Sequence, residues 1–133
     1  MASTPLYNAL VRTHHITSRK KVAKLRAAAS HHNIYALLRY GGCPGLMYCQ
    51  GSEPGVRHWV AHVQRLRYKD FRLLKKPAEK HVEGPGQANN SSVPYGKLEE
   101  ADTVKEFGAH MESFGVGTWW RVAMGYQKDE SQP

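Results

Sequence analysis

Residues 34–50, with the sequence IYALLRYGGCPGLMYCQ, contain two apolar runs separated by the turn cluster Gly41-Gly42-Cys43-Pro44. Short runs of aliphatic and aromatic residues bounded by Gly and Pro are typical of β-strands, and a connection of this length is typical of hairpins. The stretch therefore predicts two adjacent antiparallel strands, at 34–40 and 45–50.

The segment before this hairpin predicts a strand followed by a basic helix. Residues 9–16 are rich in alternating and β-branched types, and Ser18 is placed to cap a helix. Between Ser18 and about Ser30, apolar residues such as Val22 and Leu25 recur at helical spacing among lysines and arginines. We expect an amphipathic helix with a basic outer face.

The segment after the hairpin predicts a second helix and a fourth strand. Ser52 is placed as an N-cap, and Pro54 in the first turn costs little there. A buried stripe is expected at Val56, Trp59, Val60, Val63 and Leu66. Asp70-Phe-Arg-Leu-Leu74 is a short apolar run that predicts a strand. The order βαββαβ predicts an α+β, ferredoxin-like antiparallel sheet with two helices on one face.

The last third of the chain predicts a loop and a helical extension. Gly, Pro, Asn and Ser dominate residues 81–96, which predicts a flexible loop. Thr103 and Glu106 form a capping box for a third helix that ends at Gly115, and an aromatic segment follows. We expect one domain, 1–133, divided into a core at 9–80, a loop at 81–96, a C-terminal helical extension at 97–126 and a disordered tail at 127–133.

Charge is unevenly distributed along the chain. The protein has 19 Lys and Arg against 11 Asp and Glu, for a formal net charge of +8. Residues 1–80 hold 15 basic and three acidic residues, a net of +12, whereas residues 81–133 carry a net of −4. An acidic partner is therefore expected at the first eighty residues, and nucleic acid is the first candidate.

Other features of the sequence indicate the cellular compartment in which the protein is expected. The two cysteines, without a secretory signal, predict reduced thiols, and no apolar run is long enough to cross a bilayer. The first fifty residues are rich in arginine and contain no Asp or Glu, which matches the composition of a mitochondrial transit peptide. Their strand and helix patterns favour folded structure instead. We expect a nuclear or cytoplasmic protein without membrane contact.

Metal, cofactor and catalytic sites are not predicted. His58 and His62 have the i, i+4 spacing of metal ligands but lack the glutamate of a His-Glu-x-x-His site, and Cys43 and Cys49 are too far apart for a Cys-x-x-Cys site. Glycine-rich phosphate loops are absent, and the first eighty residues have too few carboxylates for acid–base or nucleophilic catalysis. A small phosphate-handling hydrolase remains as a third hypothesis, and it requires an anion site near Ser18 and Arg19.

RNA binding is the better supported chemistry. Basic side chains numerous enough to neutralise several phosphates lie at Arg19, Lys20, Lys21, Lys24, Arg57, Arg65, Arg67, Lys69 and Arg72. Tyr48 and Gln50 share one strand face, and Tyr35 shares another with Arg39, so an open sheet face would let some of them contact bases. Alternation does not decide which set faces solvent. Core packing of the tyrosines and a merely solvated basic surface are the alternatives.

Four landmarks in order resemble a known family. They are His14-His15-Ile-x-Ser18-x-Lys20-Lys21, Tyr40-Gly-Gly-Cys-Pro-Gly-Leu-Met-Tyr-Cys-Gln-Gly51, Trp59 with Arg65-Leu-Arg-Tyr-Lys69, and a tail with Phe107-Gly108, Gly115-Val116 and Trp119-Trp120. The series resembles the C-terminal domain shared by a spliceosomal tri-snRNP pre-mRNA-processing factor and certain RWD-domain-containing proteins, over about residues 10–80 and 97–126. The resemblance implies a ferredoxin-like fold and non-catalytic RNA clamping. It adds His14 and His15 to the RNA-contacting residues, beside Arg19, Lys20, Lys21, Arg65, Arg67 and Lys69.

The sequence therefore predicts a monomeric, non-enzymatic RNA-binding protein without cofactor or metal, with a further protein partner in a ribonucleoprotein complex. Its predicted RNA contacts are His14, His15, Arg19, Lys20, Lys21, Lys24, Arg39, Tyr48, Gln50, Arg65, Arg67, Lys69 and Arg72. The alternative is a protein–protein adaptor that docks through the second helix and the Trp119-Trp120 pair. Exposed tryptophans in the free monomer would favour the adaptor.

Overall fold

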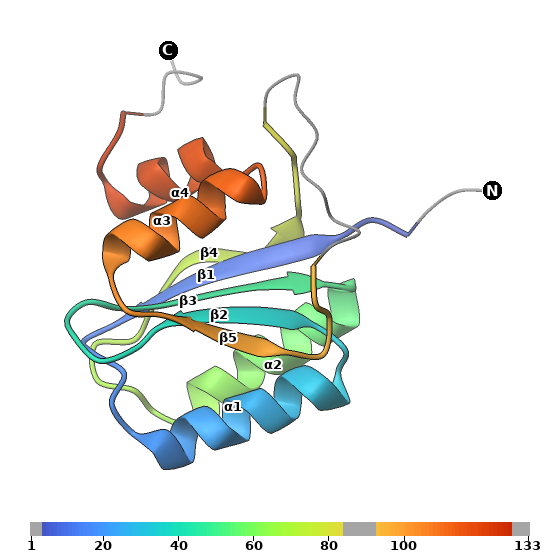
Figure 1. Cartoon of the computed structure of the whole chain (residues 1–133). Helices are drawn as coiled ribbons and strands as arrows, with labels where there is room; N and C mark the ends of the chain where they lie inside the picture. Colours follow the sequence, from blue (N-terminus) through green and yellow to red (C-terminus); the bar gives the residue numbers. More distant parts are fainter. Residues whose placement is uncertain (1–3, 84–92, 129–133) are drawn as a thin grey trace.

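A five-stranded sheet lies between two layers of helices (Figure 1). The structure is a computed structural model, which describes residues 4–83 and 93–128. In chain order the elements are β1 (Tyr7–Thr13), α1 (Arg19–His31), β2 (Tyr35–Arg39), β3 (Gly45–Gly51), α2 (Glu53–Arg65), β4 (Arg72–Glu79), β5 (Leu98–Ala101), α3 (Val104–Ser113) and α4 (Gly117–Met124).

The sheet has the strand order β4-β1-β3-β2-β5. β1 pairs antiparallel with β3 and β4, and β2 pairs antiparallel with β3. The first four strands and two helices thus confirm the predicted ferredoxin-like βαββαβ arrangement. β5, which pairs parallel to β2, was not predicted. Its four residues, Leu-Glu-Glu-Ala, include two glutamates, which are depleted in strands.

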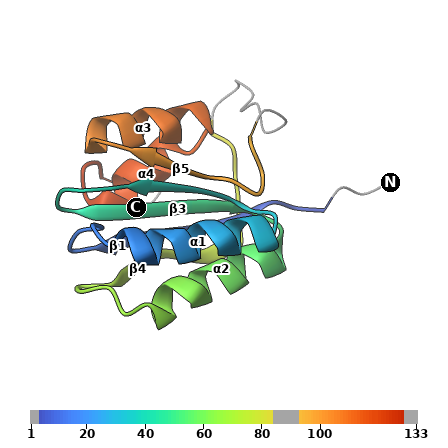
Figure 2. The ribbon, with the colours of Figure 1, turned by 60° about the horizontal axis from the view of Figure 1, so that its bottom comes forward.

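Helices α1 and α2 lie side by side across one face of the sheet (Figure 2). Both begin at the predicted caps: the Ser18 hydroxyl accepts a hydrogen bond from the Lys21 N–H, and the Ser52 hydroxyl accepts one from the Gly55 N–H, each at 3.2 Å. Each cap satisfies a backbone donor that the first helical turn cannot. The structure therefore confirms both predicted helix starts.

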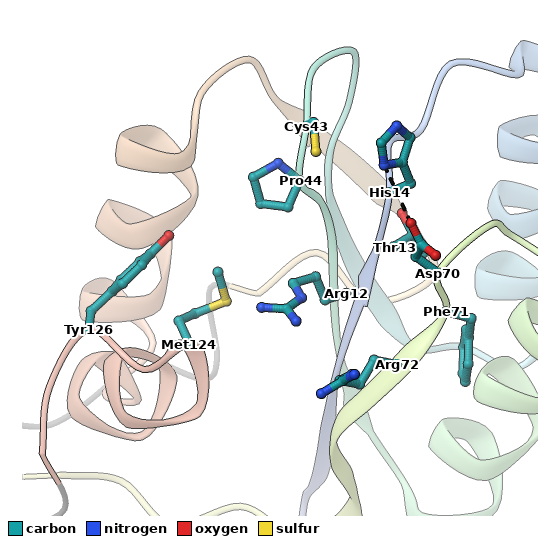
Figure 3. A pocket seen from close by; sticks show the side chains of 10 residues that line it. All are labelled: Arg12, Thr13, His14, Cys43, Pro44, Asp70, Phe71, Arg72, Met124 and Tyr126. Atoms are coloured by element: carbon teal, nitrogen blue, oxygen red, sulfur yellow. Dashed lines mark ion pairs between the residues drawn. The ribbon is translucent and has the colours of Figure 1, made fainter.

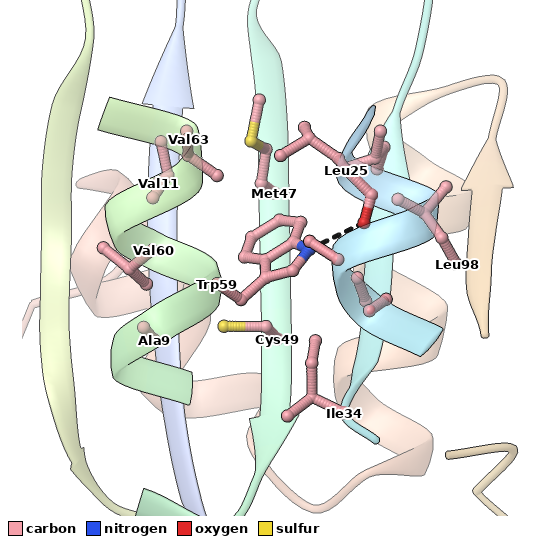
Figure 4. Close-up of a cluster of buried hydrophobic side chains, with 14 of the residues drawn as sticks. Ala9, Val11, Leu25, Ile34, Met47, Cys49, Trp59, Val60, Val63 and Leu98 are labelled. Carbon is pink, nitrogen blue, oxygen red and sulfur yellow. Dashed lines mark hydrogen bonds between the residues drawn. The ribbon is translucent and has the colours of Figure 1, made fainter. Parts of the chain in front are cut away.

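Trp59 lies at the centre of the core beneath these two helices (Figure 4). Its side chain is 1% exposed, and its indole Nε1 donates a hydrogen bond of 3.0 Å to the Leu25 carbonyl oxygen of α1. Met47 and Cys49 of β3 line the sheet side of the same core. One residue therefore joins both helices to the sheet and satisfies its only donor, as a buried indole requires.

Helices α3 and α4 cover the opposite face of the sheet, which was expected to be open. The inward residues of β2 and β3 on this face are fully buried against the helices, and the second core they form includes Leu10, Tyr35, Leu37, Leu46, Tyr48, Phe107, Met111, Val116 and Trp120. A Cβ at Gly108 would lie 2.8 Å from the Trp120 ring, so α3 and α4 pack at close range. The expectation of a free sheet face is wrong.

Several predicted boundaries also differ. β1 ends at Thr13, so His14 and His15 lie in the loop after it rather than on the strand. β4 runs from Arg72 to Glu79 and continues through two lysines and Pro77, instead of ending at 74. Lysine and proline are tolerated because β4 is an edge strand.

The predicted loop and tail lie partly outside the described residues, at 84–92 and 129–133. The described part of the loop has neither helix nor strand, as predicted, but it is not free of contacts. Val93 is 7% exposed in the second core, and Tyr95 packs against it. Among the described residues, no helix is long and apolar enough to cross a membrane.

Candidate nucleic-acid interface

Most of the predicted RNA-contacting residues meet at one end of the sheet, which we call the basic end. Three segments form it: the end of β1 and start of α1 (12–21), the β2–β3 hairpin (39–45), and the end of α2 through the start of β4 (65–72). Backbone hydrogen bonds join them, from the His14 N–H to the Lys69 carbonyl oxygen at 2.9 Å and from the Gly41 N–H to the Ile16 carbonyl oxygen at 2.7 Å. The left side of Figure 1 shows this end.

The cationic side chains of the basic end are largely accessible. Exposed positions are His15, Arg19, Lys20, Arg65, Arg67, Lys69 and Arg72, and Lys24 is exposed one turn further along α1. His14 and Lys21 are half-buried, and the Lys21 ammonium lies 4.7 Å from the Tyr68 ring centroid. The topology therefore brings together charges that are up to sixty residues apart in the chain.

Tyr48 and Gln50 cannot contact RNA in this conformation, because both are 0% exposed. The Tyr48 hydroxyl donates to the Gln50 side-chain oxygen at 2.7 Å, and the Lys80 ammonium donates to the same oxygen at 3.0 Å. Burial lowers the pKa of Lys80 to about 8. These residues form a polar network between the sheet and the α3–α4 layer, so their prediction as base contacts is wrong.

Arg39 belongs to the hairpin rather than to an open surface. It is half-buried, and its guanidinium donates to the Pro44 carbonyl oxygen at 3.4 Å. A Cβ at Gly42 would lie 2.5 Å from this guanidinium. The glycine therefore leaves room for an arginine that holds the turn, and Arg39 does not join the exposed cations.

One carboxylate offsets part of the charge at the basic end. Glu100 on β5 accepts hydrogen bonds from Arg19 at 2.8 Å and from Arg26 at 3.0 Å. The Arg19 hydrogen bond is the main cause that lowers the pKa of Glu100. Arg19 also lies over the Tyr40 ring, 3.7 Å from its centroid. Arg19 is thus engaged within the protein, unlike Lys20 beside it.

A recess of about 460 Å³ opens at the basic end, between the hairpin, β1, β4 and the end of α4 (Figure 3). Arg12 and Arg72 point into it, with Met124 and Tyr126 on the opposite wall. Neither arginine makes a side-chain hydrogen bond or ion pair with any described residue. Asp70 lies at its rim, 3.5 Å from His14.

Sequence reasoning missed two residues of this recess, Arg12 and Tyr126. Arg12 stands near the end of an otherwise apolar strand. A polar residue at that position of the alternating pattern was the signal that could have identified Arg12 as a surface residue. Tyr126 is the last residue of the predicted extension, next to a polar tail, and it is 57% exposed. Its proximity to Arg72 depends on the folding of α4 across the sheet.

His58 and His62, the two histidines considered as metal ligands, both pack against His32. His32 stacks on His58 with ring centroids 4.9 Å apart, and His62 lies 5.6 Å from His32. Burial is the main cause that lowers the pKa of His32 and His62. In the part of the chain that the structure describes, no three His, Cys, Asp or Glu residues are arranged to hold a metal ion.

The residues considered for a hydrolase have structural contacts. The Ser18 hydroxyl caps α1, and Arg19 pairs with Glu100. Cys43 is exposed in the hairpin, whereas Cys49 is buried, which raises the pKa of its thiol. A thiol with a raised pKa is a poor nucleophile.

Comparison with known proteins gives no family assignment. No protein-family model and no curated protein matches the sequence. A solved structure of a bacterial light-regulated adenylyl cyclase aligns with 92% of this chain at 11% identity and a TM-score of 0.49, and the alignment spans only 36% of that chain. The BlrP1 BLUF structure aligns with 98% of this chain and 84% of that chain, at 12% identity and a TM-score of 0.49. Neither similarity bears on function.

Proposed function

We propose that this is a non-catalytic RNA-binding protein whose basic end contacts the phosphate backbone. The observation that carries the proposal is the convergence of exposed, largely unneutralised cations from 12–24 and 65–72 on one end of the sheet. Phosphate contacts of this kind give a salt-dependent affinity that does not require a particular sequence. The resemblance to the spliceosomal domain supports the same function, with RNA processing in the nucleus or cytoplasm as its setting.

Base contacts in this proposal do not use the sheet face. Because α3 and α4 cover that face, the two-base stacking of an open four-stranded sheet is blocked in this conformation. In this proposal, side chains at the rim of the basic end contact the bases. The predicted base contacts at Tyr48 and Gln50 are therefore replaced by residues of the loops and strand ends.

The adaptor alternative loses one of the two features on which it depended, an exposed Trp119-Trp120 pair. Trp120 is 6% exposed in the second core, and Trp119 is half-buried in an edge-to-face contact with Tyr48, with 5.8 Å between ring centroids. An exposed aromatic pair is therefore not present for docking. RNA binding remains the function that the described surface supports best.

The experiment that tests this proposal compares charge-neutral variants at two places. We expect the triple variant Lys20→Gln, Arg67→Gln, Lys69→Gln to weaken binding of a single-stranded RNA at least tenfold and to make its salt dependence shallower. The matched control, Lys76→Gln, Lys97→Gln, Lys105→Gln, loses the same charge outside the basic end. Equal losses in both variants would show that net charge alone attracts RNA and would refute a defined interface.

A further inference from the structure

Two arginines on the adjacent strands β1 and β4 line the recess at the basic end. Arg12 and Arg72 are direct partners in the β1–β4 ladder. They lie on the same sheet face as Leu10 and Leu74, just beyond the end of the second core. Like charges directly opposite on a sheet repel each other.

Among the described residues that line the recess, no acidic side chain forms an ion pair with Arg12 or Arg72. Asp70, the acidic residue among its lining residues, faces His14 at 3.5 Å instead of either guanidinium. An anion bound between Arg12 and Arg72 would convert their repulsion into two attractions. Guanidinium groups bind phosphate oxygens with two parallel hydrogen bonds, so phosphate fits this chemistry.

The opposite wall offers an aromatic surface. Gly125 ends α4 with φ of +79°, a left-handed conformation that favours glycine, and turns the chain toward the recess. Tyr126 then donates its backbone N–H to the Arg121 carbonyl oxygen at 2.8 Å. Its ring meets Trp120 edge-on at 5.6 Å. The contacts with Arg121 and Trp120 thus position the tyrosine, while 57% of the residue stays exposed.

We propose that the recess binds one unpaired nucleotide of RNA, with a phosphate between Arg12 and Arg72 and a base stacked on Tyr126. The inference rests on the proposed RNA binding and names its single-strand contact. A volume of about 460 Å³ lies within the usual range for small-ligand sites. Because a base within a duplex already stacks on its neighbours, this site favours single-stranded over double-stranded RNA.

Cys43 provides a probe of this site in the unmodified protein. It lines the recess and is exposed, whereas Cys49, the second of the two cysteines, is buried. We expect a saturating eight-nucleotide single-stranded RNA to slow modification of Cys43 by N-ethylmaleimide at least fivefold. Inorganic phosphate at the same ionic strength should protect much less, because it does not cover the aromatic wall. Unchanged modification under RNA saturation would overturn the proposed site.

Variants test the two halves of the site separately. We expect Tyr126→Ala to weaken single-strand binding about tenfold, the size of one base–aromatic contact, and to change duplex binding little. The double variant Arg12→Gln, Arg72→Gln should lower the salt slope for single strands by about 0.7, the value for one lost phosphate contact. Lys97→Gln, Lys105→Gln is the control with the same charge change. Thermal unfolding verifies that each variant is folded.

The outcomes separate the inference from the function on which it rests. RNA binding that is normal in both recess variants would overturn the nucleotide site and leave the basic end as the RNA interface. Equal losses in recess and control variants would overturn it as well. If the unmodified protein binds no RNA at low salt, the proposed function fails first, and the nucleotide site fails with it.

Discussion

The carboxylate of Glu83 accepts a hydrogen bond from the backbone N–H of Trp119 at 2.7 Å, across 36 residues of sequence. Its second oxygen accepts one from the Thr118 N–H at 2.9 Å. Val116, the N-cap residue of α4, has no side-chain cap of its own. Glu83 therefore supplies both the acceptor and the negative charge that the start of a helix favours. This contact fixes α4, and with it Trp120, over the sheet.

Removal of this cap is expected to destabilise the protein. Glu83→Ala should lower the free energy of unfolding by about 1 kcal/mol, the usual cost of a lost N-cap. Urea unfolding followed by tryptophan fluorescence measures the change. Glu79→Ala, at an exposed acidic position on β4, is the control and should have little effect. Equal effects of the two substitutions would contradict the capping role.

Neutralising Arg72 should stabilise the free protein. Because Arg12 and Arg72 face each other without a described acidic partner, Arg72→Gln is expected to raise the free energy of unfolding by roughly 0.5 kcal/mol at low salt. The gain should shrink at 1 M salt, where the Debye length is about 3 Å. Lys69→Gln, an exposed neighbour outside the recess, serves for comparison. A loss of stability at low salt would show that the two arginines do not repel.

Glu100 is expected to limit RNA affinity. Its carboxylate neutralises Arg19 and Arg26, so Glu100→Gln releases Arg19 at the basic end and Arg26 further along α1. We expect binding of single-stranded RNA to tighten about threefold, the scale of one exposed ion pair. Glu112→Gln, which breaks the Arg121 pair in the α3–α4 layer, should leave the affinity unchanged. Weaker binding by Glu100→Gln would place RNA away from Arg19 and Arg26.

Two buried tyrosines predict a loss of stability at alkaline pH. Burial raises the pKa of Tyr35 and of Tyr48 well above the usual value near 10. Above about pH 10 the unfolded chain releases these protons and the folded chain keeps them, so the free energy of unfolding falls as pH rises. Each tyrosine contributes roughly 1.4 kcal/mol per pH unit in that range.

The Tyr48→Phe variant isolates one of these contributions. It loses the hydroxyl that donates to Gln50, so it should be about 1 kcal/mol less stable at neutral pH. Above pH 10 its stability should fall less steeply than that of the unmodified protein. Urea unfolding between pH 8 and 11.5 measures both slopes, and parallel curves would contradict the assignment.

The local parts of the fold could be predicted from sequence because their signals are local. The hairpin, the caps at Ser18 and Ser52, and the capping box that starts α3 each depend on residues within a few positions of one another. The Glu106 N–H donates to the Thr103 hydroxyl at 3.0 Å, as the spacing predicted. β5 escaped prediction because its strand conformation depends on pairing with β2, about sixty residues earlier.

The candidate site could be predicted only in part for the same reason. Charge counting located the cations in the first eighty residues, and the βαββαβ topology brought them to one end. Strand alternation placed Tyr48 and Gln50 on one face but could not show that α3 and α4 would cover it. Tyr126 and Arg12 meet in the recess only after α4 folds back across the sheet.

The most direct test of the central claim is a fluorescence-anisotropy titration of the full chain with single-stranded and duplex RNA at several salt concentrations. We predict micromolar or tighter binding, a log–log salt slope of about −3 or steeper for the single strand, and a preference for single strands over duplex. Absence of binding at low salt, or an affinity that does not change with salt, would contradict RNA recognition by the basic end.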